Sequence, residues 1–203
     1  MTYAAVAIVA FLLGSIPFGL IISRLFYKTD IRRSGSGNIG AMNALRTLGK
    51  TGAAAVLILD AAKGVIPALI AMRVLHSTEL AAIAAAASVL GHCFSPWLGF
   101  KGGKGVATSF GAIFALSWPA GLVTIAGWLV GALSTTYSSV GSMLANIVAP
   151  FALWYFTRDP WLTGYGVFAA FFIIYTHREN IGRIRRHEEK GIPFLRRDSS
   201  AAS

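Results

Sequence analysis

A glycine- and lysine-rich stretch, GFKGGKGVATS, separates two apolar runs near the middle of the chain and includes Gly102, Gly103 and Gly105. Backbone N–H groups at the start of a helix bind anions, and Lys101 and Lys104 add positive charge. The nucleotide-binding spacing GxxxxGK[ST] is absent because glycine follows Lys104. The stretch therefore predicts a phosphate site but no nucleotide loop. The alternative is a flexible hinge with lysines at the membrane surface.

A second polar segment, RRSGSGNIGAMNALRTLGK at residues 32–50, alternates small residues with Ser36, Asn38 and Asn43. Its glycines let backbone N–H groups turn toward an anion. Serine and asparagine add uncharged hydrogen bonds, and Arg46 can hold a phosphate with two of its N–H groups. We expect these residues to bind substrate. The alternative is a loop at the membrane surface whose basic residues contact lipid headgroups.

Two further polar segments, TYSSVGSML and YTHRENIGRIRR, follow later in the chain. His177 and Asn180 are three positions apart, so both face one groove if that segment is helical. A histidine at this place can act as a general base or donate a hydrogen bond to a phosphate. For Ser142 the alternative is a hydrogen bond back to its own helix. For His177 the alternative is a residue that only marks a helix end at the membrane interface.

Asp60 and Lys63 lie one helical step apart inside an apolar run. Ionisable groups within a membrane are costly and usually face the protein interior as pairs. We therefore expect an internal ion pair that supports the site from behind. His92 lies within another apolar run, and we expect a buried histidine whose ring is satisfied by hydrogen bonds.

The elements that position these segments must be membrane-embedded. The chain has 203 residues, of which 55% are hydrophobic and 13% charged, with a mean hydropathy of +0.64. A soluble domain carries roughly 25% charged residues. Cys93 is the single cysteine, which excludes an internal disulfide and a cysteine-built metal site. We expect no metal, no cofactor and, despite the net charge of +10, no nucleic-acid partner, because most aromatic residues lie in apolar runs.

The apolar runs predict an all-α membrane protein. They fall at about residues 3–23, 53–75, 79–98, 106–117, 119–137, 140–157 and 160–177. Run 106–117 is shorter than the roughly 20 residues that a membrane crossing needs, and it could join the next run as one helix kinked at Pro119. If this run is counted as a separate crossing, nearly all basic residues lie on one side of the membrane. This agrees with the enrichment of basic residues in cytoplasmic loops. We therefore predict seven transmembrane helices, with the N-terminus outside and the C-terminus cytoplasmic.

The two ends of the chain complete this organisation. MTYAAVAIVAFLLGS has no basic residue ahead of its apolar run, so we expect a retained membrane helix and not a cleaved signal peptide. Residues 1–203 form one predicted domain. Its basic segment 182–203 is predicted to be a cytoplasmic tail at the anionic lipid surface.

Three segments, SGNIGAMN, GHCFSPWLGFKGGKGVATS and THRENIGRI, together resemble the signature segments of the bacterial acyl-phosphate:glycerol-3-phosphate acyltransferases, the membrane-integral PlsY family. The similarity extends from GSIPFG in the first run to the last motif. Met42 departs from the threonine that is more frequent in the family. The resemblance implies acyl transfer from acyl phosphate to the sn-1 hydroxyl of glycerol 3-phosphate. This reaction gives lysophosphatidic acid and phosphate, as the first step of phospholipid biosynthesis.

The resemblance also implies roles for residues of this chain. The predicted binding residues for the acyl-phosphate head group are Gly102, Gly103, Lys104 and Gly105. Those for glycerol 3-phosphate are Ser36, Arg46, Lys104, Ser142, His177 and Asn180, with Asn38 and Asn43 shaping the first loop. Lys104, His177 and Asn180 are the predicted catalytic residues. The hydroxyl proton goes either to His177 or to the phosphate of glycerol 3-phosphate.

The implied location is the bacterial inner membrane, with the site facing the cytoplasm, lipids around the chain and no obligatory protein partner. The histidine–aspartate dyad of soluble-type glycerophosphate acyltransferases is absent, because no histidine has an aspartate five positions later. The alternative function is a membrane transporter of a phosphorylated anion. Transporters tend to have repeated halves with a site near the midplane, and neither feature is visible here.

Overall fold

The computed structural model describes residues 2–193 and 195, and within them every regular element is helical. This confirms the predicted all-α class. The α-helices are α1 (Tyr3–Ser15), α2 (Phe18–Tyr27), α3 (Ala41–Thr47), α4 (Gly49–Arg73), α5 (Thr78–Cys93), α6 (Val106–Leu116), α7 (Trp118–Thr135), α8 (Ser138–Thr157), α9 (Pro160–Thr176) and α10 (Arg178–Arg185). Two short 3₁₀ helices, η1 (Ile31–Arg33) and η2 (Pro96–Leu98), lie in the connections.

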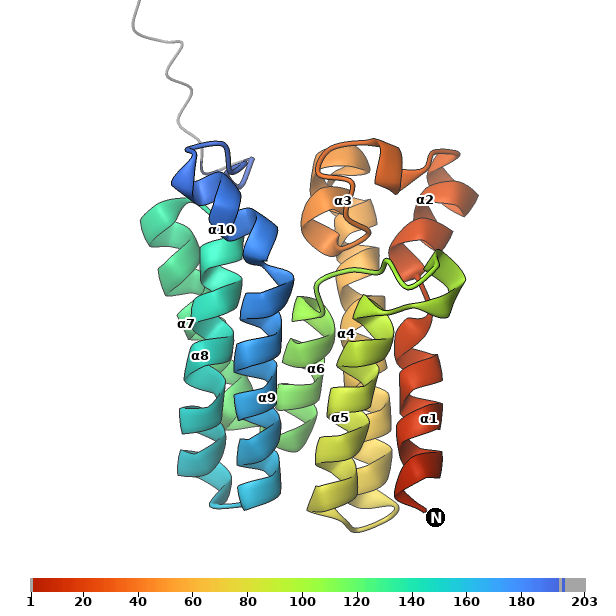
Figure 1. The fold of residues 1–203 in the computed structure, drawn as a ribbon, viewed down its shortest axis with the longest axis vertical. Coiled ribbons are helices and arrows are strands. Elements are labelled where there is room, and N and C mark those ends of the chain that lie inside the picture. Colours follow the sequence, from red (N-terminus) through yellow and green to blue (C-terminus); the bar gives the residue numbers. More distant parts are fainter. Residues whose placement is uncertain (1, 194, 196–203) are drawn as a thin grey trace, which may run out of the picture.

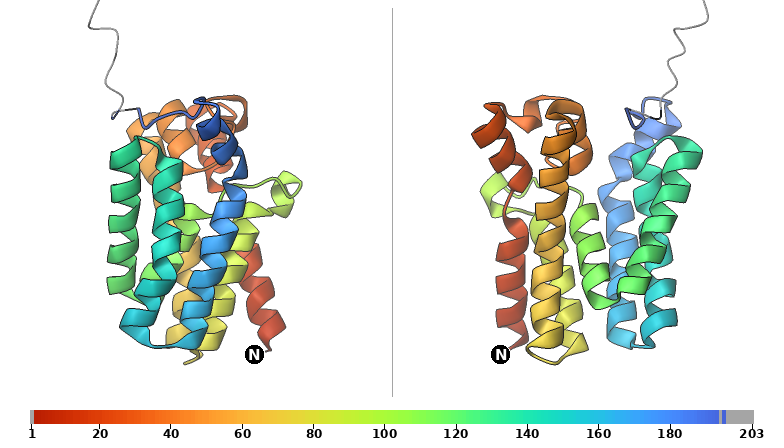
Figure 2. Two further views of the ribbon diagram at one scale, coloured as in Figure 1. Left: turned by 60° about the vertical axis from the view of Figure 1, so that its left-hand side comes forward. Right: turned by 180° about the vertical axis from the view of Figure 1, so that it is seen from behind.

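The long helices run along a common axis in two groups (Figures 1 and 2). Helices α1, α4 and α5 pack together in one group, and α7, α8 and α9 in the other. Helix α6 packs against α4 and also contacts α7 and α9, so it joins the groups. The N-terminus lies at one end of the bundle, whereas α2, α3 and α10 lie at the opposite end (Figure 1). Polar segments that are far apart in sequence therefore meet at one end.

Five segments are long and apolar enough to cross a membrane. They are Tyr3–Tyr27, Gly49–Arg73, Thr78–Leu98, Trp118–Thr135 and Ser138–Thr157, while α6 and α9 are shorter apolar helices. Large apolar side chains cover the outside of the bundle, and Phe151 and Phe171 are about three-quarters exposed. Such a surface is typical of helices in contact with lipid. The count of seven crossings and their direction remain predictions.

The first apolar run, residues 3–23, was expected to form one helix. Instead the chain breaks between α1 and α2. Pro17 has no N–H group to continue the hydrogen-bond ladder. The carbonyl groups left open at the break are satisfied by side chains from distant parts of the chain. Ser95 Oγ donates to the carbonyl of Ser15 at 2.6 Å, and Lys63 Nζ donates to that of Ile16 at 2.9 Å.

The short run 106–117 forms a helix of its own, so the possibility of one long helix kinked at Pro119 is not observed. Ser117 lies between α6 and α7 in an extended conformation with φ −159°, which interrupts the helix. Pro119 then lies in the first turn of α7, where a missing N–H group costs nothing.

Glycines bring α4 and α6 into close contact. A Cβ atom at Gly64 would lie 1.9 Å from the carbonyl oxygen of Thr108, and one at Gly111 would lie 2.1 Å from that of Ala61. The pair is reciprocal, one glycine on each helix. Small residues at such contacts let helix backbones approach in a membrane, where the hydrophobic effect does not drive helices together. This contact fixes the position of α6, whose first turn lies within the glycine- and lysine-rich stretch.

Candidate active site

A cavity of about 670 Å³ opens among α3, α4, α6, α7, α8 and the segment from His177 to Lys190. It gathers most of the predicted site residues from four separate segments. Those that line it are Ser36, Asn38, Asn43, Arg46, Lys104, Gly105, Ser142, His177 and Asn180. Part of the wall is apolar and is formed by residues such as Leu57, Phe110 and Trp128. One space thus presents both a charged wall and an apolar wall.

Gly102 and Gly103 were predicted to bind the donor but are not among the residues that line the cavity. They pack on the end of α5, where their N–H groups donate to the carbonyls of Cys93 and His92 at 2.9 and 3.1 Å. A Cβ atom at Gly103 would lie 2.1 Å from His92 Nε2. In this structure the two glycines therefore position the loop that carries Lys104, residues 99–105, here called the glycine loop. Direct contact between the two glycines and substrate remains a prediction.

Lys104 extends from this loop into the cavity. Its carbonyl accepts a hydrogen bond from Thr176 Oγ1 at 3.1 Å, and its Nζ donates to Asn180 Oδ1. Burial, together with the nearby positive charge of Arg183, lowers the pKa of Lys104 to about 8. The ammonium group is therefore still the main form at neutral pH, but its charge is poorly solvated and favours an anionic partner.

His177 occupies the junction between α9 and α10 and is buried. Its Nδ1 lies 2.8 Å from the carbonyl oxygen of Ile173. A carbonyl can only accept, so Nδ1 carries the proton and Nε2 of the neutral ring is an acceptor. Burial, and next the charge of Lys104, lower the pKa of His177 to about 4. The ring is therefore neutral at physiological pH and able to accept a proton at Nε2.

Glu189 orients Asn180, and sequence reasoning missed it. Its Oε1 accepts from Asn180 Nδ2 at 2.5 Å and from Ser139 Oγ at 2.8 Å, while Oε2 accepts from Arg183 Nε at 2.7 Å. Burial alone would raise the pKa of Glu189, but these three hydrogen bonds outweigh it and lower the pKa. No spacing signalled this role, because the residue lies in the segment predicted to be a basic tail.

Asn43 stabilises the conformation of the first loop, residues 34–40 between η1 and α3. Its Oδ1 accepts from the N–H of Ser36 at 2.7 Å, and its Nδ2 donates to the carbonyls of Asn38 and Ile31 at 2.7 and 3.0 Å. Asn38 Oδ1 in turn accepts from the N–H of Gly40 at 2.8 Å. The Asn43 amide is therefore committed to the loop, whereas the nearby Ser36, Asn38 and Arg46 line the cavity with it.

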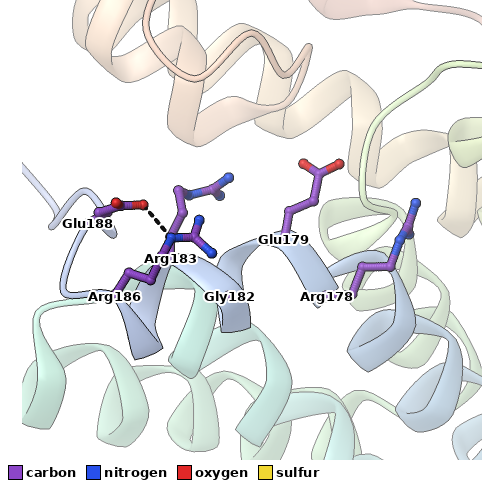
Figure 3. Close-up of a pocket in the computed structure, with 6 residues that line it drawn as sticks. All are labelled: Arg178, Glu179, Gly182, Arg183, Arg186 and Glu188. Carbon is purple, nitrogen blue, oxygen red and sulfur yellow. Dashed lines mark hydrogen bonds and ion pairs between the residues drawn. The ribbon is translucent and has the colours of Figure 1, made fainter.

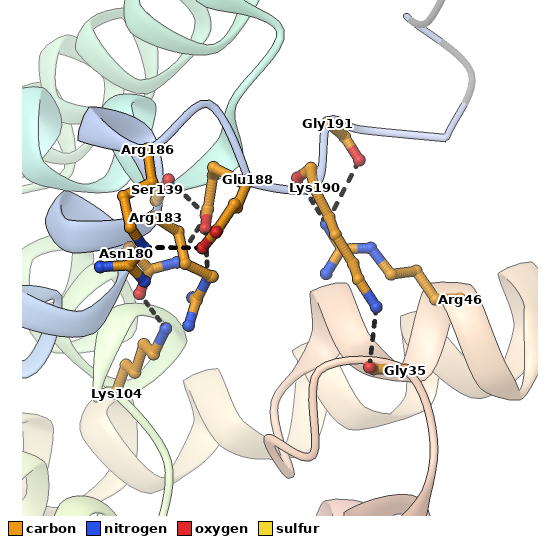
Figure 4. Close-up of polar contacts among 11 residues, drawn as sticks. Gly35, Arg46, Lys104, Ser139, Asn180, Arg183, Arg186, Glu188, Lys190 and Gly191 are labelled. Carbon is orange, nitrogen blue, oxygen red and sulfur yellow. Dashed lines mark hydrogen bonds and ion pairs between the residues drawn. The ribbon is translucent and has the colours of Figure 1, made fainter.

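Residues 188–193, here called the strap, cross the end of the cavity (Figure 4). Arg46 Nη2 donates to the carbonyls of Lys190 and Gly191 at 3.0 and 3.3 Å, and Lys190 Nζ donates to that of Gly35 at 3.1 Å. Ile192 is fully buried, and its N–H donates to the carbonyl of Thr136 at 2.9 Å. This part of the predicted tail is folded onto the site. Residues 194 and 196–203 lie outside the described residues.

The predicted ion pair between Asp60 and Lys63 is confirmed, with 2.8 Å between Nζ and Oδ1. Lys63 Nζ also lies 3.0 Å from His92 Nδ1, in addition to its hydrogen bond to the carbonyl of Ile16. The ammonium group thus makes two hydrogen bonds and one ion pair, whereas the Asp60 carboxylate has no hydrogen-bond donor among the described residues. His92 is buried and hydrogen-bonded as expected. The cluster links α4 and α5 to the break between α1 and α2, and its members Asp60 and His92 also line the cavity.

Comparison with known proteins assigns the chain to one family. A family model described as glycerol-3-phosphate acyltransferase matches residues 4–187. The chain belongs to this family. A glycerol-3-phosphate acyltransferase of Dinoroseobacter shibae is 47% identical over 194 residues, which cover 96% of this chain and 95% of the relative. One of Brucella ovis is 48% identical over 192 residues, 91% of this chain and 90% of the relative.

Solved structures give the same assignment. The glycerol 3-phosphate form of PlsY, an integral membrane glycerol 3-phosphate acyltransferase, has a TM-score of 0.88 at 40% identity over 95% of this chain and 96% of that one. Its lysophosphatidic acid form has a TM-score of 0.85 at 39% identity over 93% and 94%. The PlsY resemblance drawn from the three motifs is therefore confirmed. This member of the family is an acyltransferase and an integral membrane protein.

Ser142 lines the acyltransferase cavity but also has the alternative geometry considered from the sequence. Its Oγ donates to the carbonyl of Ser138 at 2.8 Å, within the first turn of α8. The hydroxyl oxygen can still accept a hydrogen bond, since its donor alone is used. Contact between Ser142 and substrate remains a prediction.

A second depression lies on the exposed face of α10 (Figure 3). It is open, and the residues that line it are Arg178, Glu179, Gly182, Arg183, Arg186 and Glu188. Arg186 Nε pairs with Glu188 Oε2 at 2.8 Å. Charges of both signs alternate here, and none of the predicted site residues takes part. The depression is therefore a poorer phosphate site than the cavity.

Proposed function

We propose that this acyltransferase moves a fatty acyl group from acyl phosphate to the sn-1 hydroxyl of glycerol 3-phosphate and releases lysophosphatidic acid and inorganic phosphate. One observation carries the proposal: a single cavity presents Arg46, Lys104 and Lys190 beside a wall of apolar side chains. The cations suit two phosphate groups. The apolar wall suits the alkyl chain of one substrate.

The apolar wall also reaches the outside of the bundle. Leu57 and Leu129 line the cavity, yet they are 49% and 44% exposed on the surface. An acyl chain can therefore lie between α4 and α7 with its far end in the lipid, while its phosphate stays at the charged wall. A transporter for a small phosphorylated anion has no need for such an apolar exit.

In the proposed reaction the hydroxyl oxygen attacks the carbonyl carbon of the acyl phosphate. The bond from that carbon to the bridging oxygen breaks, and phosphate leaves with the electron pair. Phosphate is a good leaving group, so the demands on the protein are orientation and charge stabilisation. Lys104 and Asn180 supply this orientation and charge stabilisation at the charged wall of the cavity. The hydroxyl proton goes to Nε2 of His177 or to the phosphate of glycerol 3-phosphate.

The proposal includes the setting of the enzyme. The chain forms one domain with seven crossings of the bacterial inner membrane, and the cavity opens to the cytoplasm. The clustering of basic residues at the end of the bundle that holds α3, α10 and the strap supports this direction, because basic loops stay on the cytoplasmic side. Both substrates then reach the site from the cytoplasm or from the inner leaflet.

The test uses the purified protein in detergent with palmitoyl phosphate and glycerol 3-phosphate. We expect stoichiometric release of phosphate and of 1-acyl-glycerol 3-phosphate, with no product when palmitoyl-CoA replaces the acyl phosphate. Acyl transfer from the thioester alone would contradict the proposed donor. A 2-acyl product would contradict the proposed position. Uptake of glycerol 3-phosphate into vesicles without acyl transfer would favour the transporter.

A variant separates the two routes for the proton. If His177 is the base, His177→Ala lowers kcat by about 100-fold at saturating substrate, the effect typical of a general base. Near-normal turnover in this variant would instead assign the proton to the phosphate of glycerol 3-phosphate. Measuring kcat, and not kcat/KM alone, keeps a loss of binding from imitating a loss of the base.

A further inference from the structure

Three cations at the cavity have no carboxylate partner among residues 2–193. Arg183 pairs with Glu189, and the buried Asp60 pairs with Lys63. The ion pairs formed by the described residues leave out Arg46, Lys104 and Lys190, all of which line the cavity. Arg46 and Lys104 are already predicted from the sequence to bind substrate. Lys190 is the one without an assigned role.

Lys190 projects from the strap toward the first loop (Figure 4). Its Nζ makes one hydrogen bond, to the carbonyl of Gly35, the residue before Ser36. An ammonium group has three donors, so two are left for a ligand. Arg46 holds the strap backbone through Nη2 alone, which leaves its other nitrogens without a protein partner among the described residues.

The cations fall into two groups on different sides of the cavity (Figure 4). Lys104 lies with Asn180 and Arg183, whereas Arg46 and Lys190 lie at the first loop. A phosphate monoester carries a charge of about −1.5 to −2 at pH 7. Two phosphorylated substrates in one cavity repel each other unless each has cations of its own. The arrangement supplies one set for each.

We propose that Lys190 is a binding residue for the phosphate of glycerol 3-phosphate, which it shares with Arg46 and the Ser36 hydroxyl, while Lys104 faces the acyl donor. This inference rests on the proposed function and specifies its acceptor site. The phosphate of the acceptor does not change its bonds during acyl transfer. A cation that holds it contributes equally to the ground state and the transition state, and so affects KM and not kcat.

The test compares Lys190→Met, Lys190→Gln and Lys190→Arg. We expect the Met and Gln variants to raise the KM for glycerol 3-phosphate roughly 10-fold, as the loss of one hydrogen bond to a charged group does, with kcat unchanged. The KM for palmitoyl phosphate also stays unchanged. The Arg variant stays within about threefold of the wild type because it keeps the charge. Lys28→Met is the matched control, since Lys28 is exposed and does not line the cavity.

The Gln variant distinguishes binding from a structural role. Its amide can still donate to the carbonyl of Gly35, so a lysine that only anchored the strap would be replaced by Gln without loss. Normal KM in Lys190→Gln, or unchanged KM in Lys190→Met, would overturn the proposal. A fall in kcat with unchanged KM would also overturn it, because that result assigns Lys190 to the transition state.

Direct binding separates this inference from the proposed function. Calorimetric titration of the detergent-solubilised protein with glycerol 3-phosphate needs no acyl donor. A roughly 10-fold weaker Kd in Lys190→Met supports the site even if acyl phosphate proves not to be the donor. Equal Kd values for wild type and variant would reject Lys190 as a ligand whatever the donor is.

Discussion

The ammonium group of Lys104 loses its proton more easily than an exposed lysine does. Burial and the charge of Arg183 place its pKa at about 8, below the ordinary value of 10.5. The cation is the form that binds phosphate, and it is present below this pKa and lost above it. We therefore expect kcat/KM for the acyl donor to fall as the pH rises through about 8, since this ratio reports ionisations of the free enzyme.

Lys104→Arg provides the comparison, because arginine stays charged throughout this range. We expect the variant to have lower activity but a flat profile between about pH 7 and 9.5. The wild-type and variant profiles are measured as initial rates of phosphate release at several pH values. An alkaline fall that persists in Lys104→Arg would show that a different group titrates there.

At the level of single residues, motifs predicted the groups that face the cavity better than the groups that hold them. Lys104, His177 and Asn180 lie in short conspicuous segments, and all three line the cavity. Glu189 and Lys190 lie in a basic stretch whose composition suggests a solvated tail. Their roles depend on the chain turning back over the site, which no local spacing reveals.

The strap depends on Glu189 because its carboxylate connects the strap to both α8 and α10. Glu189→Ala leaves Asn180 Nδ2, Ser139 Oγ and Arg183 Nε without their acceptor. We expect a loss of about 2–3 kcal/mol in the free energy of unfolding, together with a large fall in turnover because Asn180 is no longer oriented. Thermal unfolding in detergent and phosphate release measure the two effects.

Glu188 is the matched control for this variant. It is next in sequence, it also pairs with an arginine, and its side chain is 56% exposed. Exposed ion pairs contribute little, so Glu188→Ala should change stability by less than about 1 kcal/mol. Equal effects of the two substitutions would contradict the role assigned to Glu189.

The contact between α4 and α6 tests the role of close helix packing. Gly111→Ala forces a methyl group to within 2.1 Å of the carbonyl oxygen of Ala61, so the helices must separate. We expect a destabilisation of about 1–3 kcal/mol and a lower Tm. Gly164→Ala in α9 is the control, because nothing lies within 4 Å of its new methyl group. That change should stabilise the protein by up to about 1 kcal/mol.

The apolar runs located the helices, but not the breaks in them. Hydropathy is continuous across Pro17, so residues 3–23 resemble one long span. The break is stable because Ser95 and Lys63 satisfy the freed carbonyls, and both come from distant parts of the chain. The separation of α6 from α7 was predicted from the charge distribution, which is a property of the whole chain and not of the run itself.

The whole molecule combines an apolar periphery with one polar end, and this division underlies the proposed topology. Polar segments from the first loop, the glycine loop, the start of α8 and the strap meet at that end, although Gly35 and Lys190 are 155 positions apart in sequence. The number of long-range contacts needed to build the site explains why composition predicts a membrane protein but cannot predict the cavity.

Labelling with a membrane-impermeant maleimide tests the direction of the bundle. In a Cys93→Ser background, Arg73→Cys and Lys101→Cys place single thiols at exposed positions, at the end of α4 and in the glycine loop. With seven crossings and the site in the cytoplasm, intact cells label Arg73→Cys, and Lys101→Cys reacts only after permeabilisation. Inverted vesicles reverse the pattern. Labelling of both thiols from the same face would contradict the topology. One predicted crossing, residues 79–98, lies between the two positions, so they must face opposite sides of the membrane.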